Sequence, residues 1–372
     1  MKSRAAILRE APGKWEVVEL EVEDPRQDEV MVKLAACGLC HSEVHLASGN
    51  FPNETFPVCG GHEGAGVVVA VGPNTKGFAE GDHVVLTALP SCGRCAWCAR
   101  GQANLCDLSV NLLAGARMDD PTSFRLWLDG KPVAQFVGIS CFSQYTTTGT
   151  SQVVKIDPDI PLDKASLVGC AVQTGWGAAK NMAQPEPGDT VIIMGVGGTG
   201  SFALQGALHS GATNVIAVDP VASRREAAEQ LGATHSCAHI DEGADIAREL
   251  TNGQGAAATI VTVGNLEPEH VAQALASIRK GGTAVVSGLG PSTDVGVPIS
   301  MFDLTLSQKH LQGSMYGAMS GNSDVPKLLN MYIAGQLKLD EVITARYTLD
   351  QINEGYDALA DGSNVRGMIS FD

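Results

Sequence analysis

The chain has 372 residues, of which 44% are hydrophobic and 18% are charged, and this composition excludes a disordered protein. Its formal net charge is −16 and its pI is near 4.9, which argues against nucleic acid or an anionic membrane surface as a partner. No apolar run approaches the ~20 residues of a membrane helix, and the N-terminus lacks the apolar core of a signal peptide. We therefore expect a cytoplasmic protein of two domains.

The first part of the chain, from Lys2 to about Val85, is rich in strand-forming sequence. Short runs of β-branched residues alternate there with glycine, proline, asparagine and aspartate, the pattern of strands joined by turns. The predicted strands are residues 29–37, 66–71 and 81–86. This part is therefore a β-rich domain.

Two short stretches within this β-rich part carry metal-ligand residues. Cys40 lies in GLCHSEVH and His62 lies in GGHEG, which follows it along the chain. Zinc binds thiolate and imidazole groups, and a catalytic zinc site keeps one position open, so a third protein ligand must come from elsewhere. Ser42 and His45 are a hydroxyl and an imidazole that together can pass a proton outward. Glu63 can supply a carboxylate behind the metal.

Two other interpretations of this stretch stay open at this point. One is an ordinary buried cysteine beside a core histidine. The other is redox chemistry, because Cys37 and Cys40 form a C-x-x-C pair, but no thioredoxin-sized βαβ pattern surrounds them. We favour zinc over redox chemistry.

Farther along, four cysteines follow the spacing C-x2-C-x2-C-x7-C. Four thiolates without a competing histidine or carboxylate fit a closed tetrahedral zinc site, which has a structural role because no coordination position is open. The alternative is two disulfides, which the reducing compartment disfavours. We predict a structural zinc lobe over 92–106, with the ligands Cys92, Cys95, Cys98 and Cys106.

The middle of the chain gives weaker signals. Residues 111–150 read as an irregular segment with turns, and a further β stretch covers 142–156. The segment 163–180 has a helical tendency despite three glycines, and it contains Cys170, which alone is an unremarkable buried thiol.

The sequence then changes to the pattern of a dinucleotide-binding unit. A buried strand at 189–194 leads into a glycine-rich turn, a helix at 201–211 and a second strand at 214–218 that ends in Asp219. In this pattern the glycines permit a tight turn and the approach of a pyrophosphate to the helix N-terminus, while the acid binds the ribose hydroxyls. The turn, GVGGTG, includes Gly195, Gly197, Gly198, Thr199 and Gly200.

Asp219 favours NAD, because its carboxylate repels the 2′-phosphate of NADP. Arg224 and Arg225 keep NADP open as the minor possibility, although we expect them to cover the adenine side. Further alternating units follow, with strands at 259–263 and 283–287 and a helix at 267–278. The fold class is α/β, with a Rossmann doubly wound parallel sheet beside the β-rich domain, to which the chain returns after Tyr316.

Taken together, these motifs resemble the zinc-containing, medium-chain alcohol dehydrogenase family over nearly the whole chain. GHEGAG at 61–66, the four-cysteine lobe, VGCAVQTGWGA around Cys170 and GVGGTG occur in the family's order and spacing. The resemblance implies a GroES-like catalytic domain at 1–172 and 318–372 around an NAD-binding Rossmann domain at 173–317. It also implies oxidation of an alcohol to an aldehyde or ketone, with two zinc ions per chain and NAD as cofactors.

The resemblance also assigns roles to single residues. Cys170 becomes the third ligand of the catalytic zinc beside Cys40 and His62. Ser42 and His45 fall on the proton-relay positions, and Glu63 on that of the carboxylate behind the zinc. The positions that contact the coenzyme are His41 and Arg366 for the pyrophosphate and Thr174 for the nicotinamide.

Within the family, VDPVASRREAA, QKHLQGSMYG and the intact segment 111–140 are most similar to the nicotinoprotein subgroup. Members of that subgroup hold NAD(H) tightly and use nitrosodimethylaniline as an artificial electron acceptor. One residue departs from the family pattern: Glu43 stands where aspartate is usual, and its longer side chain either orients a ligand or reaches Arg366.

The resemblance leaves two rival functions open. A thiol-dependent formaldehyde dehydrogenase, acting on a glutathione or mycothiol adduct, would need basic residues for the thiol's carboxylates, and Arg117 and Arg125 are the candidates. A dinucleotide-binding zinc protein without turnover would typically lack the ligands and relay that this chain keeps. Family members are homodimers or homotetramers, which we expect here, while the identity of the alcohol is not encoded in these motifs.

Overall fold

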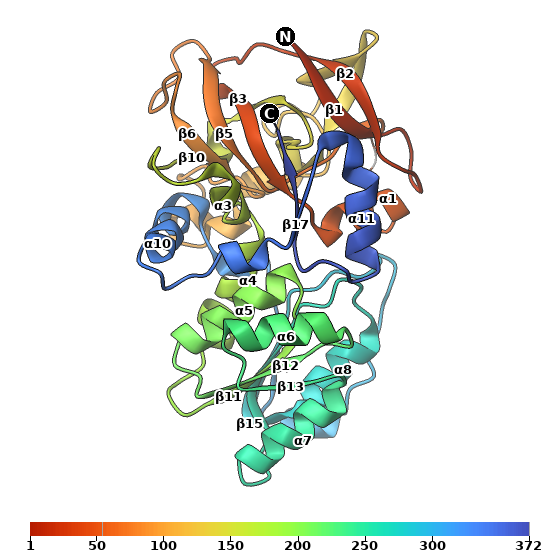
Figure 1. Cartoon of the computed structure of the whole chain (residues 1–372), viewed down its shortest axis with the longest axis vertical. Coiled ribbons are helices and arrows are strands. Elements are labelled where there is room, and N and C mark those ends of the chain that lie inside the picture. Colours follow the sequence, from red (N-terminus) through yellow and green to blue (C-terminus); the bar gives the residue numbers. More distant parts are fainter. Residues whose placement is uncertain (54, 372) are drawn as a thin grey trace. The chain divides into compact units, whose positions relative to one another are not determined.

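The computed structural model describes residues 1–53 and 55–371, which divide into two compact units (Figure 1). Unit 1 comprises Met1–Cys170 and Ser320–Asp372, and unit 2 comprises Ala171–Met319. Glu54 and Asp372, which fall inside the predicted catalytic domain, lie outside the described residues. No helix in the described part of the chain is long and apolar enough to cross a membrane. The assignment of catalytic and coenzyme roles to separate domains stays a prediction.

Unit 1 is built mainly from β-strands. Five of them close into a barrel in the order β1-β2-β7-β8-β4, and a second sheet has the order β10-β6-β5-β3-β18-β17, with β9 paired to β3. The strands are β1 (Lys2–Leu8), β2 (Glu16–Val22), β3 (Glu29–Gly38), β4 (Val58–Cys59), β5 (Gly64–Val71), β6 (His83–Leu86), β7 (Leu126–Leu128), β8 (Lys131–Gln135), β9 (Tyr145–Gly149), β10 (Val153–Lys155), β17 (Ala345–Tyr347) and β18 (Gly367–Ser370).

Strand β3 is the central element of unit 1, and its sequence explains why. Successive side chains of a strand point to opposite faces. Val30, Val32 and Leu34 accordingly pack into one hydrophobic cluster, whereas Met31 packs into the cluster of the barrel. The strand ends directly before the helix that carries part of the candidate site. The helices of unit 1 are α1 (His41–Ser48), α2 (Ala96–Ala99), α3 (Leu162–Leu167), α10 (Gly321–Ile333) and α11 (Ile352–Ala360).

The prediction of an irregular segment over 111–150 is wrong for residues 126–135, which form a β-hairpin. Strands β7 and β8 pair antiparallel around a turn at Asp129 and Gly130, both of which have positive φ. The two strands are short and contain Pro132, so local sequence gives them a weak signal. Their outer edges pair with β2 and β4 of the barrel, and these long-range partners stabilise them.

Unit 2 contains a sheet in which all strand pairs are parallel, in the order β13-β12-β11-β14-β15-β16. Numbered along the unit, this order is 3-2-1-4-5-6, the order of a Rossmann fold. The strands are β11 (Thr190–Met194), β12 (Asn214–Val218), β13 (His235–Cys237), β14 (Ala256–Val261), β15 (Ile278–Val286) and β16 (His310–Gly313). The predicted doubly wound α/β unit is confirmed.

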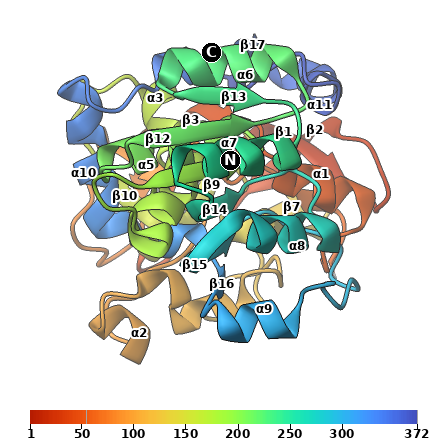
Figure 2. The ribbon, with the colours of Figure 1, turned by 90° about the horizontal axis from the view of Figure 1, so that it is seen from below.

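Helices cover both faces of this sheet. Helix α5 contacts α6, and α7 contacts α8 (Figure 2). Because crossovers between parallel strands are right-handed and the strand order reverses after β13, these two helix pairs lie on opposite faces of the sheet. Strand β11 is buried throughout, which explains its continuous run of apolar residues. The helices of unit 2 are α4 (Ala171–Gly177), continued by a π-helical turn over Ala178–Ala183, then α5 (Gly198–His209), α6 (Ala222–Leu231), α7 (Ile240–Leu250), α8 (Pro268–Ser277) and α9 (Met301–Leu306).

A buried ion-pair cluster ties the segment after the cysteine lobe to the central sheet. At the start of β3, Oε1 of Glu29 accepts hydrogen bonds from Nε of Arg117 at 2.8 Å and Nε of Arg125 at 2.7 Å. All three side chains are buried. Burial by itself raises the pKa of Glu29, but Arg125 and Arg117 outweigh it and hold that pKa below its ordinary value of 4.5.

We expect Glu29→Gln to destabilise unit 1 by about 3–5 kcal/mol, because it leaves two buried guanidinium groups without their shared carboxylate. Since the native pKa of Glu29 is lowered, its contribution is present above pH 4.5 and fades as the pH falls through the native value. Urea unfolding of both proteins at neutral and acidic pH measures this difference. Glu16→Gln, which removes the carboxylate of the exposed pair with Arg9, is the matched control. Equal losses of stability in the two variants would contradict a stabilising role for the buried carboxylate of Glu29.

Candidate active site

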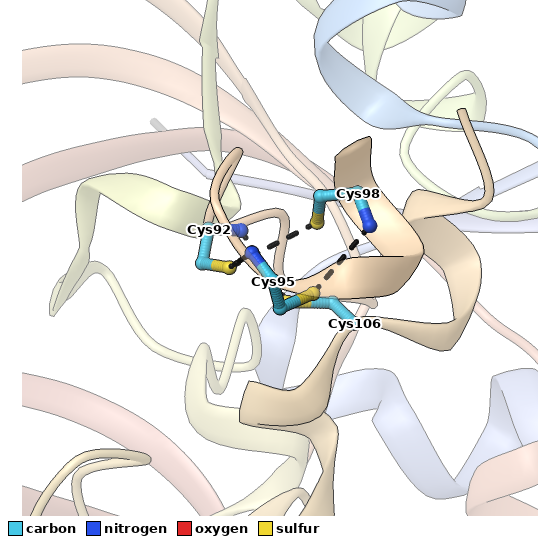
Figure 3. A group of neighbouring side chains, drawn as sticks. All are labelled: Cys92, Cys95, Cys98 and Cys106. Atoms are coloured by element: carbon cyan, nitrogen blue, oxygen red, sulfur yellow. Dashed lines mark hydrogen bonds between the residues drawn. The ribbon is translucent and has the colours of Figure 1, made fainter. Parts of the chain in front are cut away.

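The four predicted lobe cysteines converge in the structure (Figure 3). Their sulfur atoms all lie within 4.8 Å of one another. The sulfurs of Cys92 and Cys98 are 3.9 Å apart, close to the ~3.8 Å that two thiolates have on one tetrahedral zinc with bonds of about 2.3 Å. All ten cysteines, every one of them a described residue, are free thiols, which weighs against the disulfide alternative.

The backbone of the lobe is arranged to hold thiolates. The amide of Cys95 donates to the sulfur of Cys92 at 3.3 Å, and the amide of Cys98 donates to the sulfur of Cys95 at 3.4 Å. Hydrogen bonds from the amides of Asp107 and Cys98 lower the pKa of Cys95 to about 6. A donor set of four sulfurs with no open position therefore fits a closed structural zinc site.

A second group of metal-ligand residues lies where β3 ends and α1 begins. Cys40 is the residue directly before α1, and His62 lies in the turn before β5. Atoms of Cys40, His62 and Glu43 all lie within 4.8 Å of one another. Nδ1 of His62 is 2.5 Å from Oε1 of Glu43, and this contact leaves Nε2 available for a metal.

Glu43 therefore orients His62, which is one of the two contacts that the sequence left open for this residue. Burial disfavours a charged His62, yet the carboxylate of Glu43 outweighs this and raises the pKa of His62 well above its ordinary value. Glu43 itself is fully buried, and burial raises its pKa. The extra methylene relative to aspartate does not prevent the contact.

The predicted third ligand, Cys170, lies in unit 1 at the end of the turn after α3. Its side chain hydrogen-bonds with those of Cys40 and His62. The bond from Cys170 lowers the pKa of Cys40 well below its ordinary value, while the same bond raises the pKa of Cys170. Two partly buried thiols and a buried imidazole thus lie together, and this donor set fits a zinc ion with one open position.

Cys37 does not join this group. Its thiol hydrogen-bonds with Cys141, and burial raises its pKa well above the ordinary value. Because Cys37 pairs with Cys141 and Cys40 with Cys170, the two cysteines of the C-x-x-C motif do not serve each other, which weighs against redox chemistry at this pair.

Behind these ligands, Glu63 and Arg366 form a buried ion pair. Nε of Arg366 donates to Oε1 of Glu63 at 3.2 Å, and Nη2 donates to Oε2. A Cβ at Gly38 would lie 2.0 Å from Oε1 of Glu63, so only glycine leaves space for this carboxylate. The contact of Arg366 with a coenzyme pyrophosphate and the catalytic role of Glu63 stay predictions.

The predicted proton-relay residues lie on the first turns of α1. Ser42 Oγ is 3.6 Å from the sulfur of Cys40. His45 lies on the same helix and is buried, whereas His41, at the helix start, is partly exposed. The helix therefore brings Ser42 next to a candidate ligand, while the functions of all three residues stay predictions.

In unit 2 the glycine-rich turn links β11 to α5, as the sequence predicts. Gly195 has φ of +90°, and a Cβ at Gly200 would lie 1.9 Å from the carbonyl oxygen of Gly195, so both positions require glycine. A Cβ at Gly197 would meet no atom within 4 Å. The amide end of α5, with Gly198 and Thr199, thus faces open space that fits a pyrophosphate.

Asp219 follows β12 and closes this turn. Its Oδ2 accepts a hydrogen bond from the amide of Val196 at 3.0 Å, and its Oδ1 accepts one from the amide of Val221 at 2.9 Å. Two candidate contact residues, Thr174 on α4 and Arg224 on α6, also belong to unit 2. Their contacts with a coenzyme stay predictions.

Sequence reasoning missed two side chains near these groups. Thr262 donates from Oγ1 to the carbonyl oxygen of Gly195 at 2.5 Å and so braces the glycine turn. Tyr356, on α11, lies under the electrostatic influence of Glu43. Neither belongs to a motif, because both come from distant segments of the chain.

A Rossmann unit with a nucleotide-binding turn, a β-barrel unit with a cysteine and histidine metal site and a four-cysteine lobe together define a zinc-dependent dehydrogenase. Comparisons with known proteins agree with this class. Residues 26–158 match the family model described as alcohol dehydrogenase GroES-like domain, and residues 198–334 match that described as zinc-binding dehydrogenase.

The chain belongs to the zinc-containing, medium-chain alcohol dehydrogenase family. It is 45% identical to alcohol dehydrogenase B of Mycobacterium tuberculosis, covering 100% of this chain and 99% of that protein. It is 44% identical to the NDMA-dependent alcohol dehydrogenase of Amycolatopsis methanolica over 99% of both chains. Benzyl alcohol dehydrogenase from Acinetobacter calcoaceticus has a similar structure, with a TM-score of 0.91 and 29% identity over 100% of both chains.

These findings confirm the predicted fold class and the prediction that the protein is an alcohol dehydrogenase acting on small molecules. The predicted cofactors, zinc and NAD, agree with the family.

We expect the purified protein to carry two zinc ions per chain and Cys106→Ser to carry one, because three ligands hold structural zinc more weakly than four. Elemental analysis of desalted protein measures this. Cys237→Ser is the matched control, since that buried thiol lies on β13, outside both ligand groups, and its loss should leave the zinc content unchanged. Equal zinc contents in wild type and Cys106→Ser would contradict a zinc site in the lobe.

Proposed function

We propose that this alcohol dehydrogenase carries its catalytic zinc on Cys40, His62 and Cys170 and holds NAD(H) tightly through its catalytic cycle. The observation that carries the metal assignment is the convergence of two thiols with an imidazole fixed by Glu43. Bound there, zinc supplies Lewis acidity that lowers the pKa of an alcohol, and NAD accepts the hydride.

The side chains around the metal have separate tasks in this proposal. Glu43 fixes the ring of His62, so that Nε2 points away from the carboxylate. The ion pair of Glu63 with Arg366 places a second buried carboxylate behind the ligands. Ser42 takes the proton of the alcohol, and His45 on the same helix passes it outward.

Retention of the nucleotide is supported by the relative from Amycolatopsis methanolica, which is named an NDMA-dependent alcohol dehydrogenase. In an enzyme that uses an electron acceptor such as nitrosodimethylaniline, NADH is reoxidised in place by a second substrate. The structure of unit 2 is compatible with NAD, because Asp219 sets a carboxylate beside the glycine turn, where a 2′-phosphate would be repelled.

The thiol-dependent formaldehyde dehydrogenase is disfavoured by the surroundings of its two candidate residues. Arg117 and Arg125 are buried and share Glu29, and Nη1 of Arg125 also donates to Gln135 at 3.0 Å. Guanidinium groups used in this way do not present a cationic surface to the carboxylates of a thiol. Formaldehyde turnover that depends on added glutathione or mycothiol would restore this alternative.

A cytoplasmic location is our proposal on the basis of cysteine chemistry. All ten cysteines are free thiols, and six of them belong to the two proposed zinc sites, where oxidation would remove ligands. A reducing compartment keeps such thiols available.

We also propose that the chain forms a homodimer, or a homotetramer built from such dimers, through the edge of the unit 2 sheet. Strand β16 is the last strand of the sheet (Figure 2). Every residue in this strand is exposed. Apolar side chains gather on it and on the preceding α9, where Phe302 is 75% exposed. An unpaired edge and an apolar patch are both covered when a second copy adds its own β16. The other exposed apolar residues there are Met301, Leu306, Leu311 and Met315.

We expect about one equivalent of nicotinamide nucleotide to be released when desalted protein is heat-denatured, and alcohol-dependent reduction of nitrosodimethylaniline without added NAD. Absorbance and chromatography of the released nucleotide measure the first quantity. Almost no nucleotide would instead make the protein an ordinary dehydrogenase that exchanges NAD at every turnover.

Gly197→Val provides the structural control for this measurement. Because position 197 is open and has φ of −71°, a side chain fits the folded chain but fills the space assigned to the pyrophosphate. We expect this variant to keep its zinc and melting temperature and to lose the nucleotide. A variant that retains one equivalent would contradict the placement of the pyrophosphate.

We expect Phe302→Glu to shift the protein from dimer or tetramer toward smaller species in sedimentation velocity, because it places a charge in the apolar patch. Val110→Glu is the matched control, since Val110 is an exposed apolar residue of unit 1, far along the chain from β16. Unchanged sedimentation of Phe302→Glu would remove this patch from the interface.

A further inference from the structure

Several buried side-chain atoms in the described part of unit 1 have no hydrogen-bond partner, and two of them lie near the candidate metal site. These two are Oε2 of Glu43 and the hydroxyl oxygen of Tyr356. The other carboxylate oxygen of Glu43 holds His62, so the unpaired oxygen belongs to a side chain that already has a defined task. Buried polar groups without a partner are rare and costly, and a water molecule that joins these two atoms would satisfy both.

The ring of Tyr356 is held close to the turn that carries His62. It stacks on Trp15, with ring centroids 6.1 Å apart, and meets Phe142 edge-on at 6.2 Å. Phe142 in turn packs so closely on Gly61 that a Cβ there would lie 2.4 Å from its backbone nitrogen. Aromatic packing therefore fixes the ring, and with it the position of the hydroxyl group.

The helix of Tyr356 also packs against the end of β3. A Cβ at Gly355 would lie 2.5 Å from Cδ1 of Leu39, the residue before Cys40. After burial, the carboxylate of Glu43 is the strongest influence on Tyr356, and both raise the pKa of that phenol well above its ordinary value. The hydroxyl therefore keeps its proton and can donate it in a hydrogen bond to the carboxylate.

We propose that Tyr356 is a positioning residue of the metal site, whose hydroxyl donates to Oε2 of Glu43 through one water molecule. The carboxylate is then held from both sides, by His62 at Oε1 and by Tyr356 at Oε2. Without the second bond the carboxylate can rotate, and the imidazole loses its fixed orientation toward the metal. The longer side chain of glutamate, compared with aspartate, lets one carboxylate serve both partners.

This inference rests on the proposed zinc site. Its test measures the rate of zinc release rather than the rate of alcohol oxidation. Zinc release from holoenzyme to a chromogenic chelator gives one phase for each zinc site. We expect Tyr356→Phe, which keeps the ring and its packing, to speed release from the catalytic site about 10-fold or more and to leave the lobe phase unchanged. With cobalt in the catalytic site, the visible spectrum should shift in the same variant.

Tyr332→Phe is the matched control, because it removes a tyrosine hydroxyl of unit 1 that donates to Asp340 on the surface. Glu43→Asp, which withdraws the carboxylate by one methylene, supplies a second test. If Tyr356 acts through Glu43, the double variant should release zinc no faster than Glu43→Asp alone.

Three outcomes separate the possibilities. Faster catalytic-site release in Tyr356→Phe that is not additive with Glu43→Asp supports the inference. If Tyr356→Phe leaves zinc release unchanged, or if its effect adds fully to that of Glu43→Asp, the inference is wrong although the proposed zinc site remains supported. A wild-type protein with zinc in the lobe only would refute the proposed zinc site, and the inference with it.

Discussion

The hydrogen bond between His62 and Glu43 is the contact on which the rest of the candidate site depends. Both side chains are buried, so neither charge is stable there alone. The 2.5 Å contact between Nδ1 of His62 and Oε1 of Glu43 gives each its partner and leaves Nε2 of the imidazole available for a metal. The thiols of Cys40 and Cys170 complete a compact donor set with unequal proton affinities. In the proposed site a zinc ion would replace the protons that these groups otherwise share.

A second buried pair connects the two chain segments of unit 1. Glu63 and Arg366 are separated by 303 residues in sequence, yet their side chains form a bidentate ion pair under the ligands. The pair is possible because Gly38 leaves room for the carboxylate and because β18 pairs antiparallel with β3. The second segment of unit 1 thus supplies Arg366, the cation that pairs with Glu63. The same segment also contains helix α11.

Much of the fold and of the candidate site could be predicted from local patterns. The glycine turn needs Gly195 and Gly200 at fixed positions, and the strand and helix around it have clear periodicity, so unit 2 was predictable. The hairpin at 126–135 was not, because its short strands are stabilised by β2 and β4 rather than by their own sequence. The sequence also left open whether Arg117 and Arg125 bind a ligand, because their partner Glu29 lies far away in the chain and meets them only in the folded structure.

The sequence by itself determined the chemistry available to this protein: the ligand types, the spacing of the lobe cysteines, the nucleotide-binding turn and the family that these motifs resemble. These properties are local, because each depends on residues close together in the chain. The tertiary structure decided which side chains serve one another. Only folding brings Glu43 to His62, Arg366 to Glu63 and Tyr356 under the electrostatic influence of Glu43, since contacts between distant segments follow from packing and from the need to pair buried charges.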